Sequence, residues 1–270
     1  MTALRLRLRE PTASTIDVSH LVPERLRELS PEGVAQLQVW KGAERLPLGE
    51  LFDISGAPGE TLEFETDAAC LWGIGYGMSE GTIRVHGPAG PYAGRKMRGG
   101  ELHITGNAGE YAGNGMRGGR IVIDGDAGDC LAAARPGEKY GMEGGLLLVR
   151  GNAGDRVGER MRRGSVLIEG NSGAWTAARM RAGTIAVLGS TGHGLGWAMR
   201  RGTILLRQPP ASLSPLFRDN GEQALSILAL MSKAWRGLDG PFVALNPCRV
   251  QRWLGDRSVQ GLGEILLLQD

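Results

Sequence analysis

Met97-Arg-Gly-Gly-Glu-Leu-His-Ile-Thr-Gly-Asn-Ala-Gly109 is one copy of a pattern that recurs along the middle of the chain, and Met161-Arg-Arg-Gly-Ser-Val-Leu-Ile-Glu-Gly-Asn-Ser-Gly173 is another. The methionines that open the copies stand 19 residues apart, except for one step of 26 residues between Met116 and Met142. Each is followed three residues later by glycine, and five and seven residues later by aliphatic residues; they are Met78, Met97, Met116, Met142, Met161, Met180 and Met199. A fixed short period indicates a repeat architecture in which each unit packs on its neighbours.

The content of one repeat decides between helix and strand. Glycine costs about 1 kcal/mol relative to alanine inside a helix, and helical repeats run to about 33 residues or more. The segment 82–86 instead alternates apolar and polar residues, which is typical of a strand with one buried face. Glycines nine and twelve residues after the methionine supply the corners. We therefore predict a mainly β fold, a right-handed parallel β-helix of about seven 19-residue coils, with methionine filling the interior.

The repeats divide the chain into three parts: a small α+β segment at 1–70, the β-helix at 71–210, and a C-terminal helix and strand extension at 211–270. Alternating and amphipathic patterns place the elements outside the repeats. The predicted strands are Leu4–Leu8 (as an edge strand), Ala35–Val39, Thr61–Glu65 and Glu264–Leu268, and the predicted helices are Val22–Leu29 and Asn220–Arg236. Because the open end of a β-helix needs a cover, we expect one of these terminal segments at each end.

Composition excludes several classes of protein. The sequence has no run of 18 apolar residues that would span a membrane, and its first residues lack the apolar core of a signal peptide. We therefore expect a cytoplasmic protein without a membrane partner. A net charge of +2 and 5% aromatic residues argue against a nucleic-acid partner.

Residues that carry catalytic chemistry do not form a recognisable set. Cys70, Cys130 and Cys248 are far apart and form no C-x-x-C pair. The histidines (20, 86, 103 and 193) have no recurring acidic partner, and the glycine-rich stretches 73–77 and 192–196 precede no βαβ unit. We predict no catalytic residue and no metal ligand.

Arginine directly follows the methionine in five of the seven coils, at Arg98, Arg117, Arg162, Arg181 and Arg200. Stacked coils would place these side chains at intervals of roughly 5 Å, where like charges repel by on the order of 1 kcal/mol even in water. This column favours an anion. The sequence leaves three interpretations open: a solvated face, an interface with a partner's carboxylates, or a bound polyanion.

A second column should face outward and is apolar in the later coils, at Val122, Leu148, Leu167, Ala186 and Leu205. An apolar strip of this length is not left in water. The expected cover is either the predicted helix at 220–236 or a second protein chain.

The repeated unit M-R-x-G-x-φ-x-φ-x-G-N-A-G resembles the glycine-repeat domain shared by the C-terminal domain of glutamate synthase large subunits and the C subunits of formylmethanofuran dehydrogenases. Chain length and the segments 48–56 and 140–145 fit the second group better, and the likeness covers most of the chain. Family members occur in archaeal tungsten- or molybdenum-dependent formylmethanofuran dehydrogenases and in a bacterial formyltransferase/hydrolase complex. The excess of arginine over lysine favours the bacterial complex on composition alone.

The resemblance implies a non-catalytic scaffold subunit in one-carbon metabolism. The complex would move a formyl group from tetrahydromethanopterin to a methanofuran-type cofactor and hydrolyse it to formate. The implied partners are an amidohydrolase-like hydrolase subunit, a formyltransferase subunit and a dehydrogenase-B-like subunit. No cofactor is expected to be bound catalytically, but the arginine column would suit the polyglutamyl chain of a methanofuran or methylofuran. The alternatives are an archaeal-type C subunit, a structural module related to the glutamate synthase domain and, third, an independent carbohydrate-active β-helix enzyme.

Overall fold

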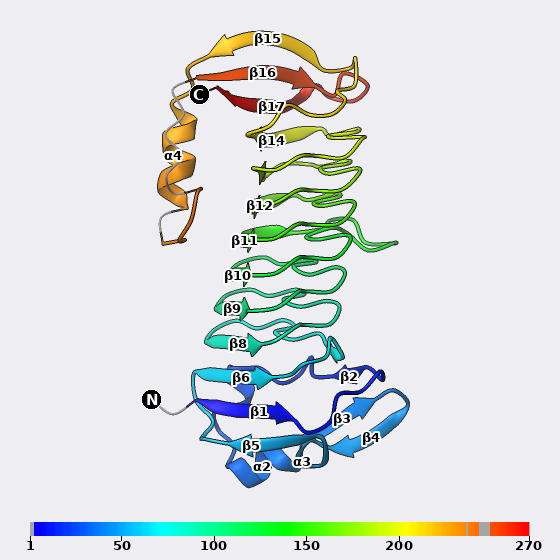
Figure 1. Cartoon of the computed structure of the whole chain (residues 1–270), viewed down its shortest axis with the longest axis vertical. Helices are drawn as coiled ribbons and strands as arrows, with labels where there is room; N and C mark the ends of the chain where they lie inside the picture. Colours follow the sequence, from blue (N-terminus) through cyan, green and yellow to red (C-terminus); the bar gives the residue numbers. More distant parts are fainter. Residues whose placement is uncertain (1–2, 236, 243–248, 270) are drawn as a thin grey trace.

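A computed structural model describes residues 3–235, 237–242 and 249–269. These residues form a mainly β protein whose strands stack along one long axis, with short helices at the N-terminal end of the stack and one helix beside it toward the other end (Figure 1). Thirteen strands make one sheet in the order β15-β16-β17-β14-β13-β12-β11-β10-β9-β8-β6-β1-β5, and four make a second sheet in the order β4-β3-β2-β7. The pairs from β1–β6 through β14–β17 are parallel.

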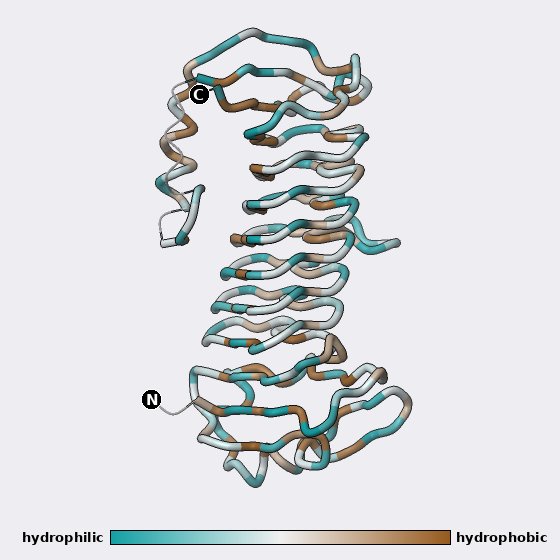
Figure 2. The backbone as a smooth tube through the Cα atoms, viewed as in Figure 1, coloured by the Kyte–Doolittle hydropathy of each residue, from teal (hydrophilic) through white to brown (hydrophobic). Residues whose placement is uncertain are grey.

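The repeats supply one strand of the large sheet per coil, and the aliphatic residues of successive strands pair with one another. The strands are β8 (Thr82–His86), β9 (Glu101–Ile104), β10 (Arg120–Ile123), β11 (Glu143–Val149), β12 (Arg163–Ile168), β13 (Thr184–Val187) and β14 (Arg201–Leu206). Ile83 pairs with Leu102, Leu102 with Ile121, and Ile121 with Leu147, so the buried aliphatic residues lie directly over one another. Figure 2 shows apolar residues recurring at corresponding places from coil to coil.

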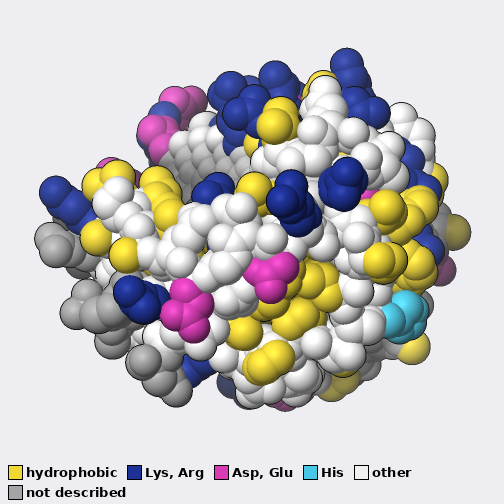
Figure 3. Space-filling view, turned by 90° about the horizontal axis from the view of Figure 1, so that it is seen from above, with side chains coloured by type: hydrophobic (Ala, Val, Ile, Leu, Met, Phe, Trp, Pro, Cys, Tyr) yellow, Lys and Arg dark blue, Asp and Glu magenta, His cyan; other side chains and the backbone are white. Residues whose placement is uncertain are grey.

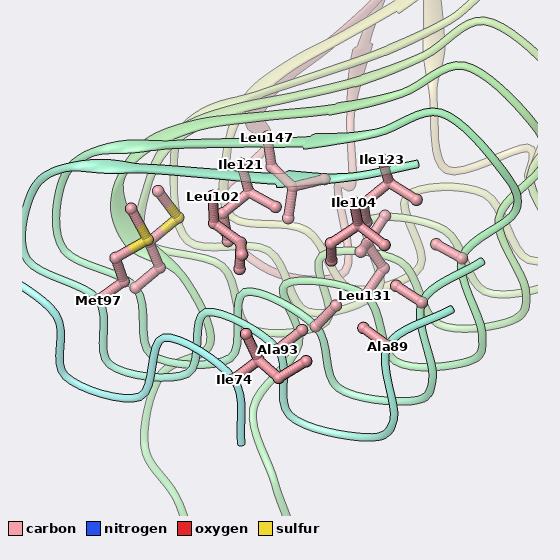
Figure 4. Packing of buried hydrophobic residues seen from close by; sticks show 14 of the residues in the cluster. Ile74, Ala89, Ala93, Met97, Leu102, Ile104, Ile121, Ile123, Leu131 and Leu147 are labelled. Atoms are coloured by element: carbon pink, nitrogen blue, oxygen red, sulfur yellow. The ribbon is translucent and has the colours of Figure 1, made fainter. Parts of the chain in front are cut away.

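The interior of the stack is apolar and closely packed. The seven methionines of the repeat are fully buried, as is the aliphatic pair of each coil. Parallel bridges join Ala89 to Ala108, Ala108 to Ala127 and Ala127 to Ala153 along a neighbouring column. In Figure 4, Met97, Leu102, Ile104 and Ala93 converge on the same interior space from different sides of the coils. Each coil therefore buries its apolar residues against the coils above and below it.

The N-terminal part continues the stack. It contributes β1 (Leu4–Leu8), β5 (Phe52–Ser55) and β6 (Thr61–Glu65) to the large sheet and forms the smaller sheet from β2 (Ile16–Asp17), β3 (Gln38–Lys41), β4 (Glu44–Pro47) and β7 (Leu71–Trp72). The expected edge position of the first strand is wrong, because β1 pairs with β5 on one side and β6 on the other.

Two short predicted elements near the N-terminus also differ. The expected helix at 22–29 is the single turn α1 (Pro23–Leu26), and a second helix, α2 (Pro31–Ala35), follows it. Pro31 disfavours a helical Ser30, and the Ser30 hydroxyl instead caps α2 by accepting a hydrogen bond from the Gly33 amide. Ala35 therefore lies in a helix and the next strand begins only at Gln38; a third helix, α3, spans Leu48–Leu51.

The C-terminal part adds β17 (Leu262–Gln269), which pairs in parallel with β14, and β16 (Arg249–Gly255) and β15 (Arg218–Gln223), which follow in antiparallel order. The predicted strand at 264–268 is confirmed. The predicted helix is shorter than expected: α4 spans Ile227–Ala234, because residues 218–223 pair with β16 and Gly221 there has a positive φ of 72°. Arg236, at its predicted end, lies outside the described residues.

The chain itself covers much of the outward apolar column. Residues of α4 and the turn after it pack against the sheet in one buried cluster that contains Leu148, Leu167, Ala186, Leu205, Leu228, Trp235, Leu238 and Phe242. The Arg120 and Arg150 guanidinium groups donate to the Gly237 and Asp239 carbonyl oxygens at 3.1 and 3.4 Å. Of the two expected covers, the C-terminal helix is therefore the one that the structure shows, and Val122 lies at the edge of the covered strip.

None of the helices formed by the described residues has the length and apolar character needed to span a lipid bilayer.

Candidate functional site

The arginine column is positioned by backbone hydrogen bonds between successive coils. The amide of Arg98 donates to the Met78 carbonyl at 2.7 Å, and Arg181 donates in the same way to Met161 at 2.7 Å. The same bond recurs from Arg117 to Met97, from Arg162 to Met142 and from Arg200 to Met180. All five predicted residues therefore occupy one position of the coil.

A carboxylate interrupts the column. Glu143 follows Met142, at the place where other coils have arginine, and its oxygens lie 3.4 Å from Arg117 Nε and 3.3 Å from Arg162 Nη1. These two arginines are thus partly neutralised. In the part of the chain that the structure describes, Arg98, Arg181 and Arg200 form no ion pair within 4.0 Å. Of these three, Arg181 and Arg200 follow the methionines of two adjacent later coils, so two positive charges that are unpaired among the described residues lie together there.

The single long coil builds one wall of this region. Its extra residues form the excursion 135–141, which leaves the stack next to β11 (Figure 1). Tyr140 lies in this excursion, with Arg162 Cζ 4.9 Å and Arg181 Cζ 5.7 Å from the centre of its ring. These distances are in the range of cation–π contacts. Tyr140 therefore holds two guanidinium groups of the column on adjacent coils.

Glu138 anchors the excursion to the stack. Its carboxylate accepts from Arg95 Nη2 at 3.0 Å, from Asn114 Nδ2 at 2.8 Å and from the Arg135 amide at 3.2 Å. Arg95 is only 8% exposed and Asn114 is fully buried, so both partners are fixed by packing. Burial alone would raise the pKa of Glu138, but the hydrogen bond from Asn114 and the charge of Arg95 lower it below its usual range.

The excursion and the later coils enclose a basic hollow of about 380 Å³, lined by Lys139, Arg160, Arg179, Arg181, Ala198, Arg200 and Val259. We define these seven residues as the basic hollow, and none of them is acidic. Arg179 forms an ion pair at 3.2 Å with Glu159, outside this lining, and Arg160 donates to the Glu138 carbonyl at 3.1 Å. Figure 3 shows Lys and Arg side chains gathered along one side of the molecule. The chemistry of the basic hollow is suited to bind carboxylates or other anions.

The buried residue Asp256 is hydrogen-bonded to the backbone of Ala198, which lines the basic hollow. The Ala198 amide donates to the Asp256 carboxylate at 3.0 Å, and the Ser258 amide donates to it at 2.7 Å. Burial favours the neutral form of Asp256, but these hydrogen bonds outweigh it and lower its pKa. Its charge is thus satisfied by backbone donors rather than by the arginines of the hollow.

Sequence reasoning found Arg181 and Arg200 but missed Lys139, Arg160 and Arg179. Arg160 and Arg179 precede their methionines instead of following them, and Lys139 is in the excursion. The signal that pointed to this place was the 26-residue step between Met116 and Met142.

The sequence shows no acidic residue that recurs beside the histidines, but in the structure His103 has an acidic partner from another coil. Its Nε2 lies 2.7 Å from Asp124 Oδ2, and the other Asp124 oxygen accepts from Arg150 Nε at 3.1 Å. The pair lines a groove of about 580 Å³ between β8–β11 and the turn after α4, together with Arg84, Glu101 and Arg120. The partner was missed because it comes from the next coil, one residue beyond the end of β10.

Thr82 supplies a hydroxyl group to the lining of this groove, but no hydrogen bond joins it to His103 in the described part of the chain. In the described part of the chain, no three His, Cys, Asp or Glu side chains converge on a position that could hold a metal ion. Cys70 and Cys130 are free thiols, and Cys248 lies outside the described residues. The arrangement that the structure does provide is the cluster of cationic side chains around the basic hollow.

Comparison with known proteins gives a consistent family. The family model described as GXGXG motif matches residues 57–219, more than half of the chain. The chain is 38% identical over 85 residues to the C component of the formyltransferase/hydrolase complex Fhc of Methylorubrum extorquens. It is 36% identical over 80 residues to the C component of a molybdenum-containing formylmethanofuran dehydrogenase of Methanosarcina barkeri. These matches cover 32% and 27% of the two relatives, and 32% and 28% of this chain.

A solved structure extends the likeness over nearly the whole chain. It is the X-ray crystal structure of the formyltransferase/hydrolase complex (FhcABCD) from Methylorubrum extorquens in complex with methylofuran. One of its chains aligns with a TM-score of 0.92 and 36% sequence identity, covering 98% of this chain and 100% of that one. Together with the repeat and the matches above, this places the protein in the GXGXG motif family, among the C subunits of formylmethanofuran dehydrogenases and formyltransferase/hydrolase complexes.

Proposed function

We propose that this protein is a non-catalytic scaffold subunit of a formyltransferase/hydrolase complex in one-carbon metabolism. The observation that carries the proposal is the alignment of nearly the entire chain, at a TM-score of 0.92, with one chain of such a complex. Its partners would be the hydrolase, formyltransferase and dehydrogenase-B-like subunits, in the cytoplasm. These partners would transfer the formyl group from tetrahydromethanopterin to a methanofuran-type cofactor and hydrolyse it to formate.

The architecture supports a scaffold role. We take the coils at 71–210 to form a right-handed parallel β-helix, which has the shape of a rod. Residues 1–70 and 211–270 would form separate units at the two ends of this rod. Because every coil is tied to the next by backbone hydrogen bonds and a shared apolar interior, such a rod holds its surface residues at fixed spacing. A rigid surface positions other subunits without contributing to their chemistry.

The arginines extend the proposal to the cofactor. Arg98, Arg117, Arg162, Arg181 and Arg200 would face the polyglutamyl arm of a methanofuran or methylofuran. The solved complex that contains the similar chain is in complex with methylofuran. Arg181 and Arg200 are the strongest candidates, because they line a hollow without carboxylates whereas Glu143 already pairs with Arg117 and Arg162. No side chain of this protein is assigned to the transfer or to the hydrolysis.

Affinity purification from the native cell tests the scaffold role directly, because it requires no prior choice of partners. We expect the tagged chain to bring down a hydrolase and a formyltransferase in fixed ratio. Flavin and iron–sulfur partners would instead support the module related to glutamate synthase, and a tungsten or molybdenum protein would support the archaeal-type complex. An isolated, catalytically active monomer would exclude a scaffold role.

The cofactor contact is tested separately. In the purified complex, Arg181→Glu combined with Arg200→Glu should reduce the amount of retained furan cofactor, measured by mass spectrometry after denaturation. Arg9→Glu, at the N-terminal end of the molecule, serves as the control because Arg9 is exposed and pairs only with Asp53 among the described ion pairs. Full cofactor retention with loss of assembly would make the column a protein interface.

A further inference from the structure

Beside the basic hollow, two tryptophans form a small open notch that the proposed cofactor contact does not use. The notch has a volume of about 230 Å³ and is lined by Arg156, Glu159, Trp175, Ala178, Arg179 and Trp197. We call these six residues the tryptophan notch. Arg179 belongs to the lining of both the notch and the basic hollow, so the two lie next to each other.

Trp197 is exposed although it is held in place. Its side chain is 42% exposed, while the Arg179 guanidinium lies 4.8 Å from the ring centre and Trp175 meets it edge-on at 5.6 Å. Trp175 in turn contacts His193 edge-on at 5.5 Å. The backbone fixes the same arrangement, because the Arg179 amide donates to the Trp197 carbonyl at 2.7 Å. A preorganised indole loses little conformational freedom on binding a partner.

Tryptophan and arginine are enriched among the few residues that contribute most of the binding energy of a protein interface. Here, as at many such interfaces, an aromatic side chain is surrounded by charged groups. Six cations and one carboxylate, Glu159, line the notch and the hollow together. Glu159 is already shared by Arg156 at 3.6 Å and Arg179 at 3.2 Å. The uncompensated charge around the notch is therefore positive and would attract an acidic surface.

We infer that the tryptophan notch is the docking site for an acidic segment of a partner subunit, which inserts one apolar side chain against Trp197 and places carboxylates near Arg156 and Arg179. This inference rests on the proposed scaffold function. It goes beyond it by naming the contact surface and the chemistry of the partner segment.

The test uses the reconstituted complex. The purified full-length chain is titrated against the remaining co-purified subunits, and the dissociation constant is measured by biolayer interferometry. Trp197→Ala should weaken binding about 30-fold, the effect of removing an interface hot spot. Trp40→Ala is the matched control, because Trp40 is 50% exposed and lies on β3 at the other end of the molecule. Arg156→Glu, whose wild-type side chain is 58% exposed, should weaken binding about tenfold or more without opening the core.

Several results would overturn the inference. Tight binding by both Trp197→Ala and Arg156→Glu would exclude the notch, as would equal weakening by Trp40→Ala. If the notch variants assemble normally but lose the furan cofactor, the occupant is the cofactor. If the isolated chain self-associates and Trp197→Ala abolishes this, the occupant is a second copy. Failure of the wild-type chain to bind the other subunits would instead refute the scaffold function itself, and melting curves of each variant separate misfolding from lost docking.

Discussion

The terminal methyl group of Met116 lies directly against Gly145, which belongs to the next coil. A Cβ atom on Gly145 would come within 2.7 Å of Met116 Cε and within 2.9 Å of the Gly119 carbonyl oxygen. The same relationship joins Met161 to Gly183 and Met180 to Gly202. The methionine of one coil therefore packs against the glycine of the next coil, and this contact holds neighbouring coils together.

This contact predicts the effect of Gly145→Ala. The residue has a φ of 91°, which an alanine adopts only with strain, and its new methyl group would collide with Met116. We expect a loss of about 3 kcal/mol or more in the free energy of unfolding, measured by urea denaturation. Gly137→Ala is the control, since Gly137 has a similar φ of 84° but no atom within 4 Å of its Cβ position. It should cost about 1 kcal/mol, and equal losses for the two variants would show that Met116 plays no part.

A ladder of side-chain amides and carboxylates ties the corners of the coils together. Asn152 Oδ1 accepts from both the backbone and the side-chain nitrogen of Asn171 at 3.0 Å, and Asn152 Nδ2 donates to Asp126 Oδ1 at 3.1 Å. Asn152→Ala removes both links and should lower the free energy of unfolding by about 1–2 kcal/mol. Asn152→Asp keeps the acceptor for Asn171 but sets a second carboxylate beside Asp126. Because salt screens the repulsion between the two carboxylates, part of the loss in the free energy of unfolding should disappear in high salt. A salt-independent loss in Asn152→Asp would contradict this account.

The coil stack was predictable because its signal repeats. A single pair of aliphatic residues two positions apart, such as Ile121 and Ile123, is weak evidence for a strand. The same kind of pair at the same place in seven repeats predicts seven stacked strands. The terminal elements have no such redundancy. Residues 218–223 became strand β15 because β16, some 30 residues later in the chain, offers an antiparallel partner. That partner is not visible in the local sequence, where the apolar residues that follow, at 224–231, suggested a helix beginning at Asn220.

The candidate site was partly predictable for the same reason. Arg181 and Arg200 share a repeat position and were found, whereas Lys139 and Tyr140 lie in the one irregular coil and have no counterpart elsewhere. His103 and Asp124 were not paired because the contact runs between coils and between different repeat positions. Contacts between residues at the same position of successive repeats can be predicted from the repeat length. Contacts between residues at different repeat positions can be predicted only when the three-dimensional shape of the coil is known.

Glu138 makes the stability of the excursion dependent on pH. Its pKa is lowered in the folded protein, so its contribution is complete above the unfolded value of about 4.3 and is lost as the pH falls through the folded value. Glu138→Gln should therefore destabilise the protein by about 1–3 kcal/mol near neutral pH, and this difference should shrink below about pH 4. Urea denaturation of both proteins at several pH values measures it. A difference that does not change with pH would mean that the Glu138 charge contributes nothing.

Tyr111 makes the stability of the fold depend on pH in the alkaline range, in the opposite direction to Glu138. Its ring stacks on Tyr92 with centres 5.4 Å apart and planes inclined by 10°. Burial of the phenol, followed by its hydrogen bond with Cys130, raises the pKa of Tyr111 to about 12. The fold thus favours the neutral phenol, so its contribution to stability is complete below the unfolded value of about 10 and is lost as the pH rises toward 12.

Two measurements check this prediction. Phenolate absorbance near 295 nm, taken as the difference between wild type and Tyr111→Phe, should show one group titrating near pH 12, with circular dichroism confirming that the fold persists. Cys130→Ala removes the hydrogen-bond partner but leaves the stacked ring, so it should move that titration to lower pH without abolishing the shift, because burial is the larger cause. A difference titration at the ordinary pKa of tyrosine in the folded wild type would show that the phenol is well solvated and that the stack with Tyr92 does not shield it.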